Sequence, residues 1–222
     1  MERYKAFLFR VMTVVALMAA SIGSALAQDY DLSGYSVESK KAKIHTEWGV
    51  GACGIYTGIT AISTEDIRLR PRIGFQGHLD MAVCFGRNFA IETEISYEGG
   101  SIDVAMGKLE HRVRTRTMDI PILLSLRALG GRIRIAAGPL FTVMSRSEYT
   151  EGGDLRLFGP ISPTWNLAAG VGIGLSKHFI LETRYIHPLD DTLNQFGAKE
   201  GNPGLEFSTR AYRITAGVTV LF

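Results

Sequence analysis

From residue 43 to residue 222 the chain alternates apolar with small or polar residues, and the connections between the alternating segments are by turns long and short. A strand that separates lipid from a polar interior needs this alternation, because successive side chains point to opposite faces. Short turns at one end and longer loops at the other are typical of barrels in an outer membrane. The pattern therefore predicts an all-β, eight-stranded antiparallel up-and-down transmembrane β-barrel.

Eight segments carry the alternation. They predict strands over 43–56, 72–85, 89–98, 112–126, 132–145, 163–175, 179–187 and 211–222. The long connections are predicted to be loops over 57–71, 99–111, 146–162 and 188–210. Because the number of strands is even, both ends of the barrel are expected on the side of the short turns.

The two faces of each predicted strand differ in chemistry. Leu79 and Val83 lie on an apolar face, whereas His78 and Asp80 lie on a polar one. Membrane interfaces attract aromatic rings. Such rings fall on the apolar faces at Phe85, Phe89, Phe179 and Phe222 near the short turns, and at Phe75, Tyr97, Phe141, Trp165, Tyr185 and Tyr212 near the loops. A soluble barrel with an apolar interior, such as a lipocalin, is the alternative, but its outer face would then carry the acids, arginines and glycines.

The first residues have the form of an export signal. Residues 1–10 are basic, residues 11–20 are apolar, and residues 25–27 (Ala-Leu-Ala) resemble a signal-peptidase site. The apolar run is shorter than the roughly 20 residues of a spanning helix. We therefore predict a signal peptide over 1–27, a periplasmic N-terminal tail over 28–42 and the barrel domain over 43–222, integral in the cell outer membrane after cleavage.

Composition narrows the classes of function. The chain has 24 Lys+Arg against 22 Asp+Glu, and loss of the signal peptide removes this excess, so no nucleic-acid partner is expected. Two cysteines are too few for a disulfide-stapled domain. Cys53 lies near the loop end of the first hairpin and Cys84 near its turn end, much farther apart than the roughly 4.4–6.8 Å between Cα atoms that a disulfide needs. Both are predicted to be free thiols.

Several short elements resemble one family. They are residues 117–124 (TMDIPILL), 135–139 (IAAGP), 169–173 (AGVGI), 181–185 (LETRY) and 215–222 (TAGVTVLF). Through them nearly the whole mature chain is similar to the PorT-like outer-membrane β-barrel proteins of Gram-negative bacteria. The resemblance implies an eight-stranded outer-membrane barrel, in most members without a defined activity. A few relatives assist a secretion apparatus.

The predicted lumen is charged. Eight strands enclose a space that side chains just fill, so a wide aqueous pore is not expected. Acids occupy the inward faces of the early strands and most arginines those of the later ones, which face each other across the lumen. Since buried charges need partners, an ion-pair plug is predicted. Its members are Glu47, Asp80, Glu92, Glu94, Asp119, Arg132, Arg134, Glu182, Arg184 and Arg213.

Catalysis is not predicted. The possible bases are His45, His78, His111, His178 and His187, but the sequence has no Gly-x-Ser-x-Gly elbow and no His/Cys cluster at metal-ligand spacing. His187 beside Asp190 and Asp191 is the best remaining candidate, and Pro188 between them indicates a turn instead. We therefore assign no catalytic, cofactor-binding or metal-binding residue and expect no cofactor.

Three classes of function stay open. They are a structural or assembly/interaction barrel with a plugged lumen, a narrow channel or secretion-associated barrel, and an interfacial enzyme of the lipid acyltransferase or hydrolase type. The first is favoured, and we expect a monomer that meets outer-membrane lipid and the outer-membrane assembly machinery. Arg112, Arg114 and Arg116 share an outward face above the apolar band. Lipopolysaccharide phosphates lie at that level, so these arginines are predicted to contact lipopolysaccharide.

Overall fold

The computed structural model describes residues 44–62, 67–197 and 204–222. The predicted signal peptide (1–27) and periplasmic tail (28–42) lie outside these residues, so their boundaries stay predictions. In the described ranges no helix is long and apolar enough to cross a membrane.

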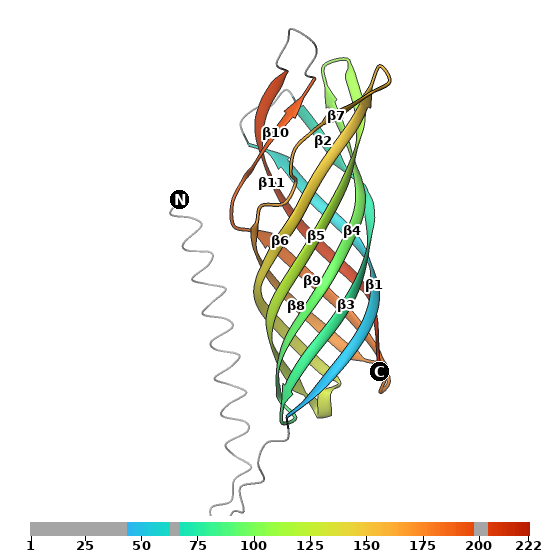
Figure 1. Cartoon of the computed structure of the whole chain (residues 1–222), viewed down its shortest axis with the longest axis vertical. Coiled ribbons are helices and arrows are strands. Elements are labelled where there is room, and N and C mark those ends of the chain that lie inside the picture. The colour runs from blue at the N-terminus through green and yellow to red at the C-terminus, as the bar shows by residue number, and fades with distance from the viewer. Residues whose placement is uncertain (1–43, 63–66, 198–203) are drawn as a thin grey trace, which may run out of the picture. The chain divides into compact units, whose positions relative to one another are not determined.

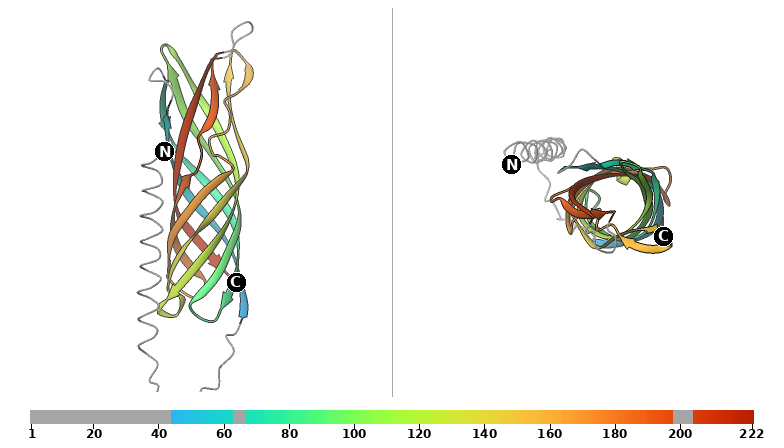
Figure 2. Two further views of the ribbon diagram at one scale, coloured as in Figure 1. Left: turned by 90° about the vertical axis from the view of Figure 1, so that its left-hand side faces the viewer. Right: turned by 90° about the horizontal axis from the view of Figure 1, so that it is seen from above.

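The described chain is almost entirely β-structure (Figure 1). Eight long strands pair in the order β1-β3-β4-β5-β6-β8-β9-β11, and β11 pairs back with β1 to close the ring (Figure 2, right). All neighbours in the ring are antiparallel. The strands are β1 Ile44–Ala61, β3 Ile73–Phe85, β4 Phe89–Met106, β5 Leu109–Ala128, β6 Ile133–Glu151, β8 Trp165–Gly174, β9 Phe179–Pro188 and β11 Leu205–Leu221. The predicted eight-stranded antiparallel barrel is confirmed.

Three short strands extend the ladders at the end away from the C-terminus (Figure 1). β2 (Ile67–Pro71) pairs with β4, β7 (Asp154–Leu157) with β6, and β10 (Thr192–Phe196) with β11. At the other end a single 3-10 turn, η1 (Leu129–Gly131), joins β5 to β6. Gly130 and Gly131 there have φ angles of 69° and 88°, which glycine adopts without steric cost.

The described residues of the long loops predicted at 57–71, 99–111, 146–162 and 188–210 are largely strand, which corrects that prediction. The reason is a reversal of the two faces, seen along β4. Tyr97 is exposed on the outer face and Glu98 is buried inside, whereas farther along Ile102 and Val104 are buried inside and Asp103 points outward. The alternation continues beyond Tyr97, but its apolar side chains now face inward. A search for outward apolar residues therefore ends too early.

The interior beyond this reversal is an apolar core, here named the loop-end cluster. Its buried residues are Ile59, Ile67, Ile102, Val104, Val113, Tyr149, Phe158, Ile161, Phe196, Phe207 and Ala211. The rings of Phe158 and Phe207 meet edge to face with centroids 5.8 Å apart. Burying each large apolar side chain contributes about 1.5–3 kcal/mol, so the cluster stabilises the long strands above the apolar outer surface.

The outer surface below the reversal is apolar. All the aromatic residues predicted for the two girdles are exposed on it except Phe141, which is half-buried against Trp165 with ring centroids 4.4 Å apart. A contiguous exposed apolar surface of this extent suits lipid rather than water. The soluble-barrel alternative requires the opposite arrangement of the two faces.

The register of the first hairpin also agrees with the prediction. In the β1–β3 ladder Cys53 lies opposite Gln76, and Cys84 lies opposite His45. The two cysteines thus occupy distant rungs, and both are free. The predicted free thiols are confirmed.

Candidate functional site

The charged lumen is the candidate site, and its first group of ion pairs lies near the short turns. Arg127 donates from Nη1 to Glu47 Oε2 at 2.8 Å and from Nη2 to Glu92 Oε1 at 3.0 Å. Arg134 Nη2 donates to the same oxygen of Glu47 at 3.2 Å. Arg127 was not among the predicted residues, because the predicted strand ended at residue 126. The inward parity of β5, continued by one residue, would have found it.

A cavity of about 740 Å³ lies at this end of the lumen. It is lined by Glu47, Arg127 and Arg134 together with residues of the three short turns. Arg132 also lines it and differs from the prediction, since its side chain is exposed and no ion pair with another described residue involves it. Arg132 follows η1 and precedes β6, so strand parity does not govern the direction of its side chain.

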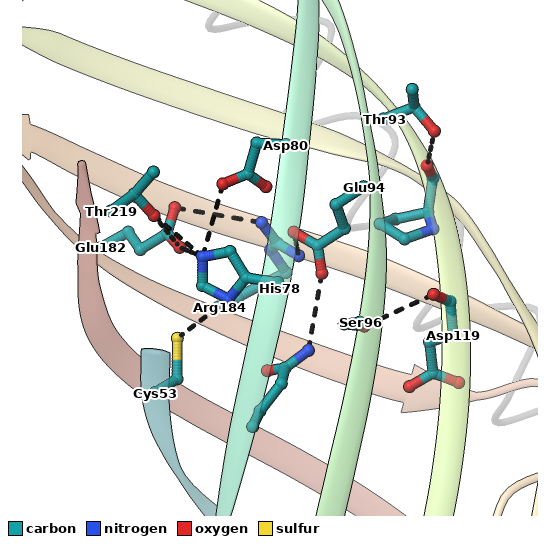
Figure 3. A network of polar contacts seen from close by, with 12 residues as sticks. Cys53, His78, Asp80, Thr93, Glu94, Ser96, Asp119, Glu182, Arg184 and Thr219 are labelled. Atoms are coloured by element: carbon teal, nitrogen blue, oxygen red, sulfur yellow. Dashed lines mark hydrogen bonds and ion pairs between the residues drawn. The ribbon is translucent and has the colours of Figure 1, made fainter. Parts of the chain in front are cut away.

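The second set of contacts, here named the mid-lumen group, centres on His78 (Figure 3). His78 Nε2 lies 2.9 Å from Thr219 Oγ1, 3.3 Å from Glu182 Oε1 and 3.4 Å from Asp80 Oδ2. On the other side of the ring, Nδ1 lies 3.8 Å from Cys53 Sγ. Thr219 Oγ1 also donates to Glu182 Oε1 at 3.0 Å. One buried imidazole thus joins a thiol, a hydroxyl and two carboxylates.

Arg184 ties this group to the opposite wall. Its Nη1 lies 2.8 Å from Glu94 Oε2 and its Nη2 lies 4.0 Å from Glu182 Oε2. Gln76 Nε2 donates to the other oxygen of Glu94 at 3.5 Å. Because β4 and β9 are opposite strands in the ring, the contact between Arg184 and Glu94 spans the lumen.

Arg213 makes the third crossing, closer to the loops. Its side chain is 1% exposed, and Nη1 donates to Glu98 Oε2 and to Asp119 Oδ2, both at 2.6 Å. Asp119 Oδ1 also accepts a hydrogen bond of 2.7 Å from Thr142 Oγ1, which itself accepts one from Asn166 Nδ2 at 3.0 Å. Glu98 was not among the predicted residues, although the inward parity of Glu92 and Glu94 leads to it.

All the predicted lumen residues except Arg132 therefore take part in ion pairs. A change in chemistry along the lumen axis was not predicted. Most of the buried ion pairs lie in the half near the short turns, and the loop-end cluster fills the other half with apolar side chains.

The outer face carries a second charged region, on the loop side of the apolar surface. Arg112, Arg114 and Arg116 are exposed on the outside of β5, the face that parity predicts. Asp103 accepts from Arg72 Nε at 2.7 Å and from Arg112 Nε at 3.2 Å. These hydrogen bonds, that from Arg72 above all, hold the pKa of Asp103 below its usual range.

Further arginines on neighbouring strands enlarge this region. Arg146 pairs with Glu148 at 3.2 Å, and Arg116 reaches the same carboxylate at 3.8 Å. The ladder places Arg116 directly opposite Arg146. We name the exposed set the arginine belt, and its members are Arg68, Arg70, Arg72, Arg112, Arg114, Arg116 and Arg146.

The histidines outside the mid-lumen group make structural contacts. The ring of His111 packs 5.4 Å from that of Tyr149, His45 Nε2 lies 3.5 Å from Glu47 Oε1, and His178 Nδ1 lies 3.0 Å from the carbonyl oxygen of Leu221. Of the remaining candidate, His187 beside Asp190 and Asp191, the His187 ring stacks on Tyr185, while Asp191 accepts from Arg210 at 2.7 Å.

Comparison with known proteins agrees with the fold. A family model for the outer membrane protein beta-barrel domain matches residues 27–194. OprG from Pseudomonas aeruginosa has a similar structure, with a TM-score of 0.50 and 12% identity over 84% of this chain and 99% of that one. Neisserial surface protein A has the same score and identity over 79% and 97% of the two chains. No curated protein matches the chain by sequence.

At 12% identity the two solved structures show the shared fold alone. The family match covers most of the chain, and the closed ring with its apolar outer surface fits a place in the outer membrane. The chain therefore belongs to the family of the outer membrane protein beta-barrel domain.

Proposed function

We propose that this protein is a closed outer-membrane barrel with a structural or interaction role, whose lumen is plugged. The observation that carries the proposal is the fully buried Arg213, which bridges Glu98 and Asp119 across the lumen at 2.6 Å. Beyond it, toward the loops, lies the loop-end cluster. Ion flow needs a continuous column of water, and both features oppose one.

The finer assignment also belongs to this proposal. Most of the PorT-like proteins that the chain resembles have no defined activity, and help to a secretion apparatus, as in a few of them, stays an alternative. We further propose that the barrel acts as a monomer, that it meets the outer-membrane assembly machinery, and that it is not an enzyme. The contacts of the histidines, which engage them in packing and ion pairs, support the last point.

Conductance across planar bilayers tests the proposal. The purified barrel, shown to be folded by its faster gel migration before boiling, should leave the bilayer as silent as detergent alone. Regular unitary current steps from folded protein would contradict a closed lumen and favour the narrow channel.

We also propose that the arginine belt contacts the phosphates of lipopolysaccharide. The belt follows the exposed apolar surface on the loop side, and among the described residues Asp103 and Glu148 are the carboxylates that pair with its seven arginines. Arginine binds phosphate through two parallel hydrogen bonds, which a fixed strand surface favours. The alternative is that the arginine belt is a solvated surface whose charges only aid solubility.

A triple variant distinguishes contact with lipopolysaccharide from a merely solvated surface. R112Q/R114Q/R116Q should retain less lipopolysaccharide on purification and still fold. The matched control R87Q/R132Q/K177Q removes three exposed positive charges at the short-turn end and should retain as much as the wild type. Equal retention by both variants would reject lipopolysaccharide contact by the belt.

A further inference from the structure

The mid-lumen group holds three side chains of the kinds that bind transition metals. One donor atom each from Cys53, His78 and Glu182 lies within 4.8 Å of the other two. They come from β1, β3 and β9 and meet only because the ring closes through β11. Thiolate, imidazole and carboxylate together suit zinc or cobalt, whereas magnesium and calcium prefer oxygen alone.

Two glycines make the room for these side chains. A Cβ atom built on Gly51 would collide with the imidazole of His78, and one built on Gly217 would collide with Cys53. Thr219 donates a hydrogen bond to Glu182 and thereby orients its carboxylate. Such hydrogen bonds to a ligand are a regular part of metal sites.

The charge around His78 is also unbalanced. The carboxylates in this region are Asp80, Glu94 and Glu182, and Arg184 is the one guanidinium of the described chain that contacts them. Even a protonated His78 leaves an excess of negative charge, and the buried Asp80 Oδ2 has an ion-pair contact of 3.4 Å with His78 but accepts no hydrogen bond. A buried excess of this kind is costly and favours an added cation.

Two cavities lie between this group and the short turns. A cavity of about 60 Å³ is lined by Asp80, Glu182 and Thr219. It shares the lining residues Glu47 and Arg134 with the larger cavity at the short-turn end. The short turns of outer-membrane barrels face the periplasm, so periplasmic ions can enter from that side.

We propose that the mid-lumen group is a binding site for one divalent transition-metal ion, with Cys53, His78 and Glu182 as its protein ligands. The ion takes one nitrogen of the imidazole. Cys53 and Glu182 now face different nitrogens, so the ligands converge by rotation about their side-chain bonds. Binding displaces the proton of the Cys53 thiol, which leaves to solvent.

A second trio, His45, Glu47 and Cys84, lies near the short turns and has the same chemistry. It is the weaker candidate, because Glu47 already accepts hydrogen bonds from Arg127 and Arg134. There the two acids Glu47 and Glu92 balance the two arginines, and little is gained from a further cation.

Titration of the purified full barrel with cobalt(II), under a reductant that does not bind metals, tests the proposal. Cobalt bound by a thiolate has a charge-transfer band in the near ultraviolet, whereas cobalt on lipid phosphates has none. We expect this band to saturate at about one ion per barrel. C53S should lose it and C84S, the matched control, should keep it. T219V should weaken binding about 10–100-fold.

Each variant is first checked for folding by gel migration before and after boiling. Should C53S not fold, E182Q takes its place and should bind cobalt at least about tenfold more weakly. A folded wild type without the band would overturn the proposal. So would a band that survives in C53S and disappears in C84S, because the ion would then sit at the short-turn trio.

Discussion

Replacement of Arg213 by methionine tests whether the ion pairs of the lumen hold the barrel together. Arg213 is the largest fully buried side chain of the described residues, and its guanidinium is shared by Glu98 and Asp119. Methionine keeps much of the side chain's length and removes the charge. Two buried carboxylates then lose the same partner at once.

The expected loss is large. Breaking a buried ion pair from one side typically costs about 3–5 kcal/mol, because the remaining charge is buried without compensation. With two carboxylates affected, R213M should lower the free energy of unfolding by about 5 kcal/mol. The matched control is R112M, which removes an exposed arginine 3.2 Å from Asp103 and should cost only about 0–1 kcal/mol.

Equilibrium unfolding in denaturant, followed by tryptophan fluorescence, measures both losses. Trp48 and Trp165 lie half-exposed on the outer surface, so unfolding takes them out of lipid or detergent. The triple variant R213M/E98Q/D119N should recover most of the stability, because no unpaired charge remains. If the free energies of unfolding of R213M and R112M differ by less than about 1 kcal/mol, the buried cluster contributes no more stability than a surface ion pair, which refutes the expected loss.

Three further predictions address packing, protonation and the membrane state. G217A should lose about 1–3 kcal/mol, since its Cβ would strike the backbone and side chain of the neighbouring strand, whereas G77A, with open space around it, should be close to neutral in the same unfolding assay. NMR titration should find the pKa of Asp103 below its usual value and raised again in R72Q. The pKa of this carboxyl group is lower in the folded than in the unfolded state. The stability that the carboxylate contributes is therefore present above its unfolded pKa of about 3.9 and is lost as pH falls through the folded value. The protein should leave membranes only with detergent and migrate more slowly on gels after boiling, and mass spectrometry should find two unlinked thiols; a detergent-free soluble form or an intramolecular disulfide would contradict the structure.

The strands β3 and β4 show which side-chain directions the local alternation of residues predicts. Alternation along β3 correctly predicted which side chains face lipid, because that choice depends on one residue and its immediate neighbours. On β4 the same rule stopped near Tyr97, where the apolar side chains change from the outer to the inner face. Beyond that point the strand is stabilised by the loop-end cluster, whose members come from distant parts of the chain.

The candidate site also has features that the local sequence pattern predicts and features that it does not. That Glu94, Arg184 and Arg213 point inward follows from parity, so the sequence could name them. It could not name their partners, and it missed Arg127 and Glu98 because strand ends are the least certain part of a sequence-based assignment. Partners across the lumen depend on the closure of the ring between β1 and β11 and on the register of every ladder in between.

The sequence by itself therefore determined the barrel, the eight strands of its ring and the direction of most side chains in the part of each strand near the short turns, because alternation and turn length are local properties. Tertiary structure alone decided that Cys53, His78 and Glu182 meet, and that His78 lies beside Thr219 although 141 positions separate them in the chain. Spacing along the sequence carries no record of such a contact. It arises when the last strand hydrogen-bonds to the first, because closure turns one face of the sheet inward and places strands that are distant in the chain around the same lumen.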